Sequence, residues 1–310
     1  MNLPEELQFI QNGFLPQKTT DARLDGKVCV ISGTTSGIGY EAAKQLAAGG
    51  AHLIMICRNE EKAQTVKKVL EHEYNAQVEF FIADYKRLSE VRRVGEEISK
   101  NYPKIYALIN NAGIFNKSRH LTPDGNEEVF GVIHLASFLL TSLLLKNLKN
   151  GSPSRVIDIS SEAHRFGGLN INDLNWSKRP YIGLLAYGAA KIAQIHTMQE
   201  MAERLESSGV TVNAMHPGAV RTNIGMNNNI FYRMYNRYIL RWFLKDPTIS
   251  GKAIYYLTAA RKMETVTGKF FNQTIEEKPA WYTVKPSLRQ KVWELSENLI
   301  QPINEGGYDV

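Results

Sequence analysis

The sequence has few cysteines and no concentration of charge of one sign. Only two cysteines, Cys29 and Cys57, occur in 310 residues, so neither a disulfide framework nor a zinc site is expected. Lys and Arg (37) exceed Asp and Glu (31), which gives a formal net charge of +6, and the basic residues are scattered. Because nucleic-acid-binding proteins concentrate positive charge on one surface, we expect no nucleic-acid partner. His, Cys and acidic residues show no metal-ligand spacing, so no metal is predicted.

Hydrophobic segments typical of secreted or membrane-spanning proteins are also not expected. Residues 1–14, MNLPEELQFIQNGF, contain early acids and no apolar core of the kind a signal peptide has. No apolar run was expected to reach the roughly 20 residues that a membrane helix needs. With the low cysteine content, these features favour a reducing, cytoplasmic location.

Short apolar runs alternate with helical patterns along most of the chain. The runs are hydrophobic at nearly every position, which is typical of parallel strands buried on both faces of a sheet. We therefore predict an α/β fold, a single doubly wound Rossmann domain with a parallel sheet of about seven strands flanked by helices. The expected strands are residues 27–33, 52–58, 77–84, 105–113, 155–161, 210–218 and 268–272.

The same alternation sets the domain organisation. Residues 1–24 are interpreted as an N-terminal arm, and residues 25–310 as one domain, because no linker or repeat interrupts the pattern. Long helices are expected near 37–48, 126–149, 185–207, from 248, and near 286–299.

A glycine-rich turn follows the first predicted strand. The segment SGTTSGIGY, residues 32–40, leads directly into the first predicted helix. Glycines allow a sharp turn and let the backbone approach a pyrophosphate, and the helix N-terminus offers free N–H groups to the anion. A turn without a ligand is the alternative, but the position between strand and helix favours a dinucleotide. The expected cofactor-binding residues here are Gly33, Thr35, Ser36, Gly37, Ile38 and Gly39.

The end of the second strand bears on which dinucleotide binds. Sites for NAD usually carry an acid there that binds the ribose 2′-hydroxyl. In this chain the segment is CRNEEK, with Arg58 at the strand end and Glu60 already in the next helix. A guanidinium suits a 2′-phosphate, although a solvated surface arginine is the alternative. We therefore favour NADP(H) and leave NAD(H) open.

A tyrosine and a lysine stand four residues apart in AYGAAK, residues 186–191. Tyr187 and Lys191 would share one side of a helix. Taken alone, this pair is more typical of a packed helix face than of a catalytic site. A nearby ammonium would, however, stabilise a phenolate and lower the pKa of the tyrosine.

With GTTSGIG, NNAG and YGAAK, the chain resembles the short-chain dehydrogenase/reductase family over roughly residues 25–300. The segments CRNEEK, SSEAHRFG and HPGAV resemble its retinol-dehydrogenase-like branch. The resemblance implies an oxidoreductase that interconverts a carbonyl and an alcohol with a nicotinamide cofactor.

The resemblance also implies residue roles. Tyr187 matches the catalytic acid/base, and Lys191 matches the lysine that binds the nicotinamide ribose and lowers the pKa of the tyrosine. Ser161 matches the serine that hydrogen-bonds the substrate oxygen, and its hydroxyl could donate to a developing alkoxide. Further cofactor-binding residues implied by the family are Asp84, Asn111, Ala112, Gly113, Pro217, Gly218, Val220 and Thr222.

One position departs from the family pattern. Ile133, in GVIHLASFLLT, stands where the family usually has an asparagine that kinks the helix and holds a water in a proton relay. Isoleucine has no hydrogen-bonding side chain, so the relay is cut or runs through His134 or Ser137. Two interpretations follow: a slower enzyme, which we favour, or a non-catalytic NADP(H)-binding sensor or scaffold.

The substrate side is less specific. Residues 219–246 match the family's flap over the substrate, and aromatic and basic residues alternate along them. They are either an amphipathic helix packed on the body or an apolar lid over a hydrophobic alcohol or carbonyl, with peripheral membrane contact through 226–245. Because the family often dimerises through the helices near 126–149 and 185–207, a homodimer is a further expectation.

Overall fold

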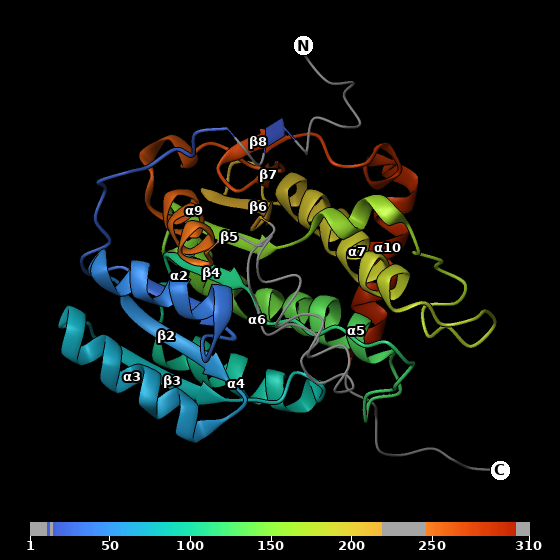
Figure 1. Cartoon of the computed structure of the whole chain (residues 1–310), viewed down its shortest axis with the longest axis horizontal. Coiled ribbons are helices and arrows are strands. Elements are labelled where there is room, and N and C mark those ends of the chain that lie inside the picture. Colours follow the sequence, from blue (N-terminus) through green and yellow to red (C-terminus); the bar gives the residue numbers. More distant parts are fainter. Residues whose placement is uncertain (1–10, 13–14, 219–245, 302–310) are drawn as a thin grey trace.

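The computed structural model describes residues 11–12, 15–218 and 246–301. Within these residues one eight-stranded sheet has the order β3-β2-β1-β4-β5-β6-β7-β8 (Figure 1). The reversal of strand order beside β1 is that of a doubly wound fold, so the predicted fold class is confirmed. The strands are β1 (Val28–Ser32), β2 (His52–Cys57), β3 (Val78–Ile82), β4 (Ala107–Asn110), β5 (Ser154–Ile159), β6 (Val210–His216), β7 (Phe270–Asn272) and β8 (Ile275–Glu277).

Strands β1 to β7 pair in parallel, and β8 pairs antiparallel with β7. The sequence predicted about seven parallel strands and did not anticipate β8. This strand is three residues long and reads IEE, so it has no apolar run. It forms because the chain reverses after β7 at Gln273, which has a φ of +56°.

Helices cover both faces of the sheet (Figure 1). One layer contains α2 (Gly37–Ala48), α3 (Glu60–Tyr74) and α9 (Thr248–Ala259), with a hydrophobic cluster beneath it. The other contains α4 (Leu88–Asn101), α6 (Ala136–Asn150), α7 (Gly183–Arg204) and α10 (Pro286–Leu299), with a second cluster. Alternate residues of β1 serve the two clusters: Ile31 faces the first and Val30 the second. Cys29 and Cys57 are free and buried in the first cluster.

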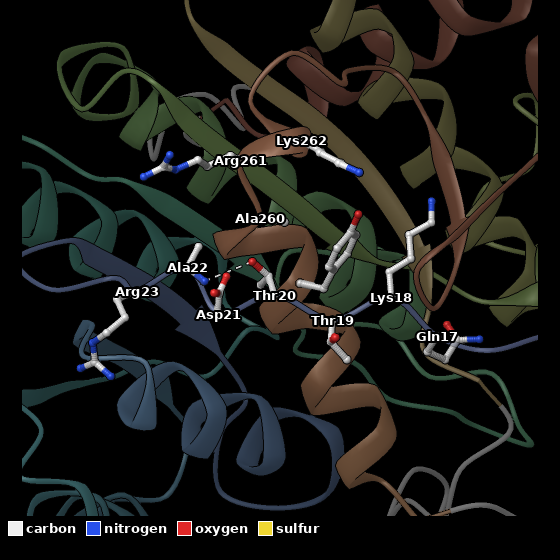
Figure 2. A pocket seen from close by; sticks show the side chains of 11 residues that line it. Gln17, Lys18, Thr19, Thr20, Asp21, Ala22, Arg23, Ala260, Arg261 and Lys262 are labelled. Carbon is white, nitrogen blue, oxygen red and sulfur yellow. Dashed lines mark hydrogen bonds between the residues drawn. The ribbon is translucent and has the colours of Figure 1, made fainter.

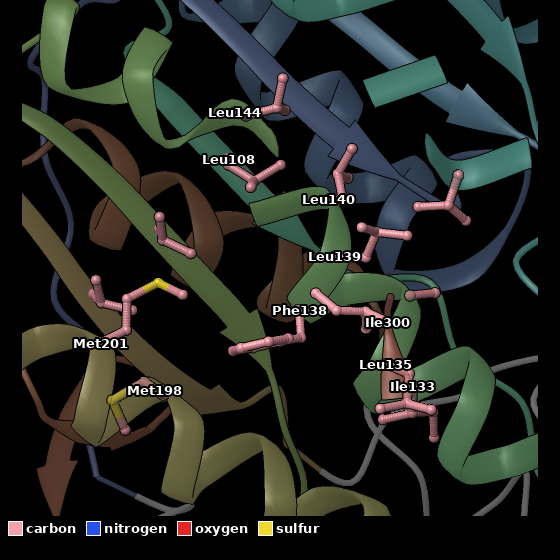
Figure 3. Close-up of a cluster of buried hydrophobic side chains, with 14 of the residues drawn as sticks. Leu108, Ile133, Leu135, Phe138, Leu139, Leu140, Leu144, Met198, Met201 and Ile300 are labelled. Carbon is pink, nitrogen blue, oxygen red and sulfur yellow. The ribbon is translucent and has the colours of Figure 1, made fainter. Parts of the chain in front are cut away.

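The long helix near 126–149 is not regular. It starts as α5 (Glu128–Phe130), widens into a π-turn at η2 (Gly131–Leu135) and continues as α6. Leucines of this helix pack with Leu108 and Met198 in the core (Figure 3). By length and composition the span Glu128–Asn150 could cross a membrane, so the expectation that no run reaches that length was wrong; 83% of its most apolar window is buried inside the fold.

Helix α10 lies across the two helices that the dimer prediction uses. It packs on α7, and the ring of Trp293 meets that of Phe138 on α6 at a centroid distance of 4.9 Å. Helix α10 therefore covers part of both helices, and the homodimer stays an untested prediction.

Of the predicted arm, the structure describes residues 11–12 and 15–24. Residues 15–24 lie against the body of the domain. The amide of Leu24 donates to the carbonyl of Gly49, and the hydroxyl of Tyr255 donates to the carbonyl of Ala22. Farther along, the amide of Lys18 donates to Oγ1 of Thr274 beside β8. Residues 15–24 are therefore held across α9 and the end of the sheet.

Candidate active site

Ser161 lies two residues beyond the carboxyl end of β5, at the edge where open α/β sheets bind ligands. It caps the 3-10 turn η3 (Glu162–Phe166), and its Oγ accepts from the amide of Ala163 at 3.1 Å. Its carbonyl oxygen accepts from Nδ1 of His164 at 2.7 Å. Nε2 of that buried histidine accepts in turn from the amide of Ala280. His164 thus fixes the turn that presents the serine hydroxyl, through hydrogen bonds to Ser161 and to Ala280.

Tyr187 and Lys191 lie one turn apart on α7, and the structure brings both to Ser161. The side chain of Ser161 lies close enough to the Tyr187 hydroxyl to lower the pKa of that hydroxyl. The ammonium of Lys191 donates to the carbonyl of Ile159 at 2.5 Å and to Oε1 of Gln194 at 3.2 Å. Its Nζ lies 5.6 Å from the centroid of the Tyr187 ring. The three predicted catalytic residues therefore form one cluster.

The pKa of Tyr187 differs from the expectation. We expected Lys191 to lower it, but burial raises the pKa of Tyr187 to about 12, and the nearby side chain of Ser161 opposes that rise. The tyrosine therefore holds its proton at neutral pH and is placed as a proton donor. Burial lowers the pKa of Lys191 to about 7, and the charge of Asp158 acts in the opposite direction.

The glycine-rich turn is held to the strand ends by two side chains. Oγ of Ser32 accepts from the amides of Asn111 and Ala112, both at 3.0 Å. Nδ2 of Asn111 donates to the carbonyls of Ser32 and Gly33 at 2.9 and 3.1 Å. Asn111 therefore holds the turn in place through two of its backbone carbonyls. Gly39 is packed against the same place, because a Cβ there would lie 2.2 Å from the carbonyl oxygen of Gly33.

The N-terminus of α2 fits a phosphate group. Ser36, its N-cap, makes no side-chain capping bond, and no acid lies in the first turn. In contrast, α3 is capped by Asn59 and begins with Glu60 and Glu61. Because the first N–H groups of a helix need partners, the uncapped end of α2 suits an anion. Around it, Thr35 and Ile38 are half-buried, Ser36 is exposed, and Gly37 has a φ of +59°.

The residues expected near the adenosine end lie beyond β2 and β3. Arg58 directly follows β2 and is exposed, and its guanidinium has no hydrogen bond or ion pair with the part of the chain described. Asp84 follows β3, where its Oδ1 accepts from the amide of Lys86 and its own amide donates to Glu90. Arg58 is thus available to a ligand, whereas Asp84 is half-buried and already hydrogen-bonded to Lys86 and Glu90.

The segment after β6 is described only in part. The carbonyl of Pro217 accepts from Oγ of Ser250 at 2.6 Å. Gly218 has a φ of +91°, a conformation that favours glycine. Val220, Thr222 and most of the predicted flap, including the proposed membrane-contact residues 226–245, lie outside the described residues.

Ile133 is fully buried in the π-turn η2. A Cβ added at Gly113 would lie 3.6 Å from its Cγ1, so the isoleucine packs beside the NNAG segment. The helix is therefore irregular here although the expected asparagine is missing, and Ile133 supplies only apolar contact.

Comparison with known proteins agrees with this geometry. Residues 27–232 match the family described as short chain dehydrogenase. The chain belongs to the short chain dehydrogenase family. Human retinol dehydrogenase 13 is 35% identical over 301 residues, which covers 94% of this chain and 89% of that protein. Human retinol dehydrogenase 14 is 35% identical, with 89% and 87% covered, and the chicken WW domain-containing oxidoreductase is 36% identical, with 90% and 69% covered. The chain is thus retinol-dehydrogenase-like within this family.

Solved structures share the fold. A putative uncharacterized protein from Mycobacterium paratuberculosis superposes with a TM-score of 0.72 at 29% identity, over 92% of this chain and 98% of that one. A putative short chain dehydrogenase from Shigella flexneri, complexed with NADP, gives a TM-score of 0.66 at 25% identity, with 82% and 99% covered.

Three residues of this dehydrogenase-like site were missed by the sequence analysis. Ser32 ties the glycine-rich turn to Asn111, His164 fixes the turn at Ser161, and the charge of Asp158 on β5 opposes the fall in the pKa of Lys191. Asp158 did carry a signal, since it is an acid within the otherwise apolar run VIDI.

A polar hollow of about 920 Å³ lies away from this site, between the arm and α9 (Figure 2). It is bounded by residues that precede β1 and by the C-terminal end of α9, so it lies at the opposite edge of the sheet. Its lining includes the exposed cations Lys18, Arg261 and Lys262 and none of the predicted site residues.

Proposed function

We propose that the protein is an NADP(H)-dependent oxidoreductase that interconverts a carbonyl and an alcohol on an apolar substrate. The observation that carries this proposal is the grouping of Ser161, Tyr187 and Lys191 at the carboxyl edge of the sheet, with the ammonium of Lys191 one turn along α7 from Tyr187. Family membership supports the reaction class.

The cofactor would supply or accept the hydride, and the chain's own residues would manage the proton. In the direction of reduction, Tyr187 gives its proton to the carbonyl oxygen, and the Ser161 hydroxyl donates a hydrogen bond to the same oxygen. Tyr187 suits this role because burial keeps it protonated at neutral pH. The charge of Lys191 then favours the phenolate that remains. In oxidation the same groups act in reverse.

The preference for the phosphorylated cofactor is carried by Arg58. Relatives from Shigella flexneri and Escherichia coli are described as complexes with NADP and NADPH, which supports the proposal. We predict that Arg58→Ala raises the Kd for NADPH about tenfold and leaves that for NADH unchanged, since a charge-assisted bond to the 2′-phosphate is lost. Fluorescence titration with both cofactors measures this, with Arg261→Ala as an exposed control at the far edge of the sheet. Equal losses for both cofactors would argue for a general structural effect.

An apolar substrate is supported by the surroundings of Tyr187. The ring of Phe115 meets that of Tyr187 edge-on, at a centroid distance of 6.0 Å. Leu184, one turn before Tyr187 on α7, is 44% exposed, and Phe166, at the end of η3, is 60% exposed. Two of the curated relatives are named for retinol. Retinal and other long apolar aldehydes are therefore the first substrates to test.

The rival function is a sensor or scaffold that binds NADP(H) without turnover, and Ile133 is the reason to consider it. We predict that Ile133→Asn raises kcat by up to about 100-fold, if the missing asparagine is what slows proton transfer. The amide would cost about 1–3 kcal/mol of stability because it is buried in an apolar core.

Ile133→Val is the matched control, since it disturbs the same packing and adds no hydrogen-bonding group. A wild type without turnover that becomes active as Ile133→Asn would favour the sensor. A variant that folds and shows no gain would contradict the idea of an interrupted relay.

The cytoplasmic location is proposed on the two free, buried cysteines, which suit a reducing compartment. Fractionation of cells that express the full chain tests it, and recovery in the membrane pellet would contradict it.

A further inference from the structure

A carboxylate is buried directly behind the catalytic cluster. Asp158 precedes Ile159, the residue whose carbonyl binds Lys191, and its side chain is 7% exposed. Nδ2 of Asn110, on the neighbouring strand β4, donates to its Oδ1 at 2.8 Å and to Oγ1 of Thr141 at 3.0 Å. Acids are rarely buried unless a partner stabilises the charge, so this residue needs an explanation.

A small cavity of about 10 Å³ adjoins the carboxyl group. That volume is close to the smallest that holds one water. Its polar lining includes Asp158, Gln194 and Ser137, and Oγ of Ser137 is buried without a hydrogen-bond partner in the described chain. One water there would satisfy Ser137 and hydrate the carboxylate. Gln194 connects the cavity to the catalytic cluster, because its Oε1 accepts from Lys191.

Asp158 and Lys191 influence each other's protonation. Burial raises the pKa of Asp158 to about 6, and both the bond from Asn110 and the charge of Lys191 oppose this rise. Burial lowers the pKa of Lys191 to about 7, and the charge of Asp158 opposes this fall. Without the carboxylate, the lysine would therefore lose its proton at a still lower pH.

The other groups around the carboxyl carry no charge at neutral pH. Asn110 on β4, Thr141 on α6 and Gln194 on α7 do not titrate. His134 also lines the cavity, and burial lowers its pKa to about 3, so it stays neutral. Within the described residues, Lys191 is thus the charged side chain that acts on the carboxyl group of Asp158.

We infer that Asp158 is a positioning residue of the active site, whose buried carboxylate supplies the counter-charge that keeps Lys191 protonated beside Tyr187. The inference rests on the proposed function, in which a charged Lys191 favours the phenolate. The carboxylate and the cavity lie on the polar side of the irregular helix, marked by His134, Ser137 and Thr141, whereas Ile133 faces the NNAG segment.

Infrared difference spectroscopy of the cofactor-free protein tests the coupling without any substrate. In the wild type, a protonated-carboxyl band that is missing from Asp158→Asn should appear as the pH falls through about 6. In Lys191→Met the same band should titrate at least one pH unit higher, because the opposing positive charge is gone. An unchanged titration in Lys191→Met would overturn the inference. Should Asp158→Asn fail to fold, the shift between wild type and Lys191→Met still decides it.

The pH profile of turnover gives the second readout. With Asp158→Asn, the alkaline limb of kcat for carbonyl reduction should move about one unit to lower pH, because Lys191 is discharged earlier. Thr258→Val, which also removes a buried polar group but from α9 on the other face, should keep the wild-type profile. A uniform loss of kcat without a shift would overturn the inference. If the wild type turns over no substrate, the proposed function fails, and the infrared titration alone decides the role of Asp158.

Discussion

Tyr187→Phe is expected to lower kcat for carbonyl reduction on the order of 1,000-fold, because it removes the group that gives its proton to the substrate oxygen. The change removes one hydroxyl group, while the ring keeps its contact with Phe115. Cofactor affinity and melting temperature should therefore change little. The assay follows NADPH absorbance with a substrate that the wild type reduces.

Tyr256→Phe is the matched control for this experiment. Tyr256 is a buried tyrosine on α9, at the opposite edge of the sheet from the cluster, and its loss should leave kcat unchanged. Turnover by Tyr187→Phe within tenfold of the wild type would show that the proton comes from elsewhere.

Gly39→Ala is expected to weaken NADPH binding about 100-fold, which corresponds to ~3 kcal/mol. The new methyl group would lie 2.2 Å from the carbonyl oxygen of Gly33 and 2.4 Å from Nδ2 of Asn111. The clash involves backbone, so either α2 or the turn has to move, and overpacking of this kind typically costs 1–3 kcal/mol. Isothermal titration with NADPH and a thermal melt measure the two consequences.

Gly113→Ala provides the comparison for stability. A Cβ at Gly113 meets nothing closer than 3.6 Å, which is ordinary contact with Ile133. This variant should melt close to the wild type, whereas Gly39→Ala should melt several degrees lower. A Gly39→Ala protein with wild-type affinity and melting temperature would contradict the close packing of turn and helix.

The sheet could be predicted because its strands are buried on both faces. Strands such as β1 and β2 are recognised as nearly continuous apolar runs, and the glycine-rich turn marks the passage from β1 to α2. Strand β8 could not be predicted from its three residues, since a chain reversal rather than apolar burial creates it. The π-turn at Gly131–Leu135 could not be predicted either, because a buried apolar segment has the same hydrophobic pattern whether its turns are α-helical or π-helical.

The residues of the site could largely be predicted from the sequence, but their electrostatics could not. Ser161, Tyr187 and Lys191 were expected together, and the structure places them together. The sequence could not show that Asn111 binds the backbone of the glycine-rich turn, because that contact depends on the pairing of β4 with β1. Nor could it show that burial raises the pKa of Tyr187, because solvation depends on the packing of the whole fold.

The central claim is that this chain turns over a carbonyl substrate with NADPH. The most direct measurement is the oxidation of NADPH by the wild-type protein against a panel of aldehydes, ketones and quinones that includes retinal, with each alcohol product quantified. The account predicts that at least one apolar carbonyl is reduced with one NADPH consumed per alcohol formed. Tight binding of NADPH without consumption above the level of Tyr187→Phe, across the whole panel, would contradict it and favour the sensor.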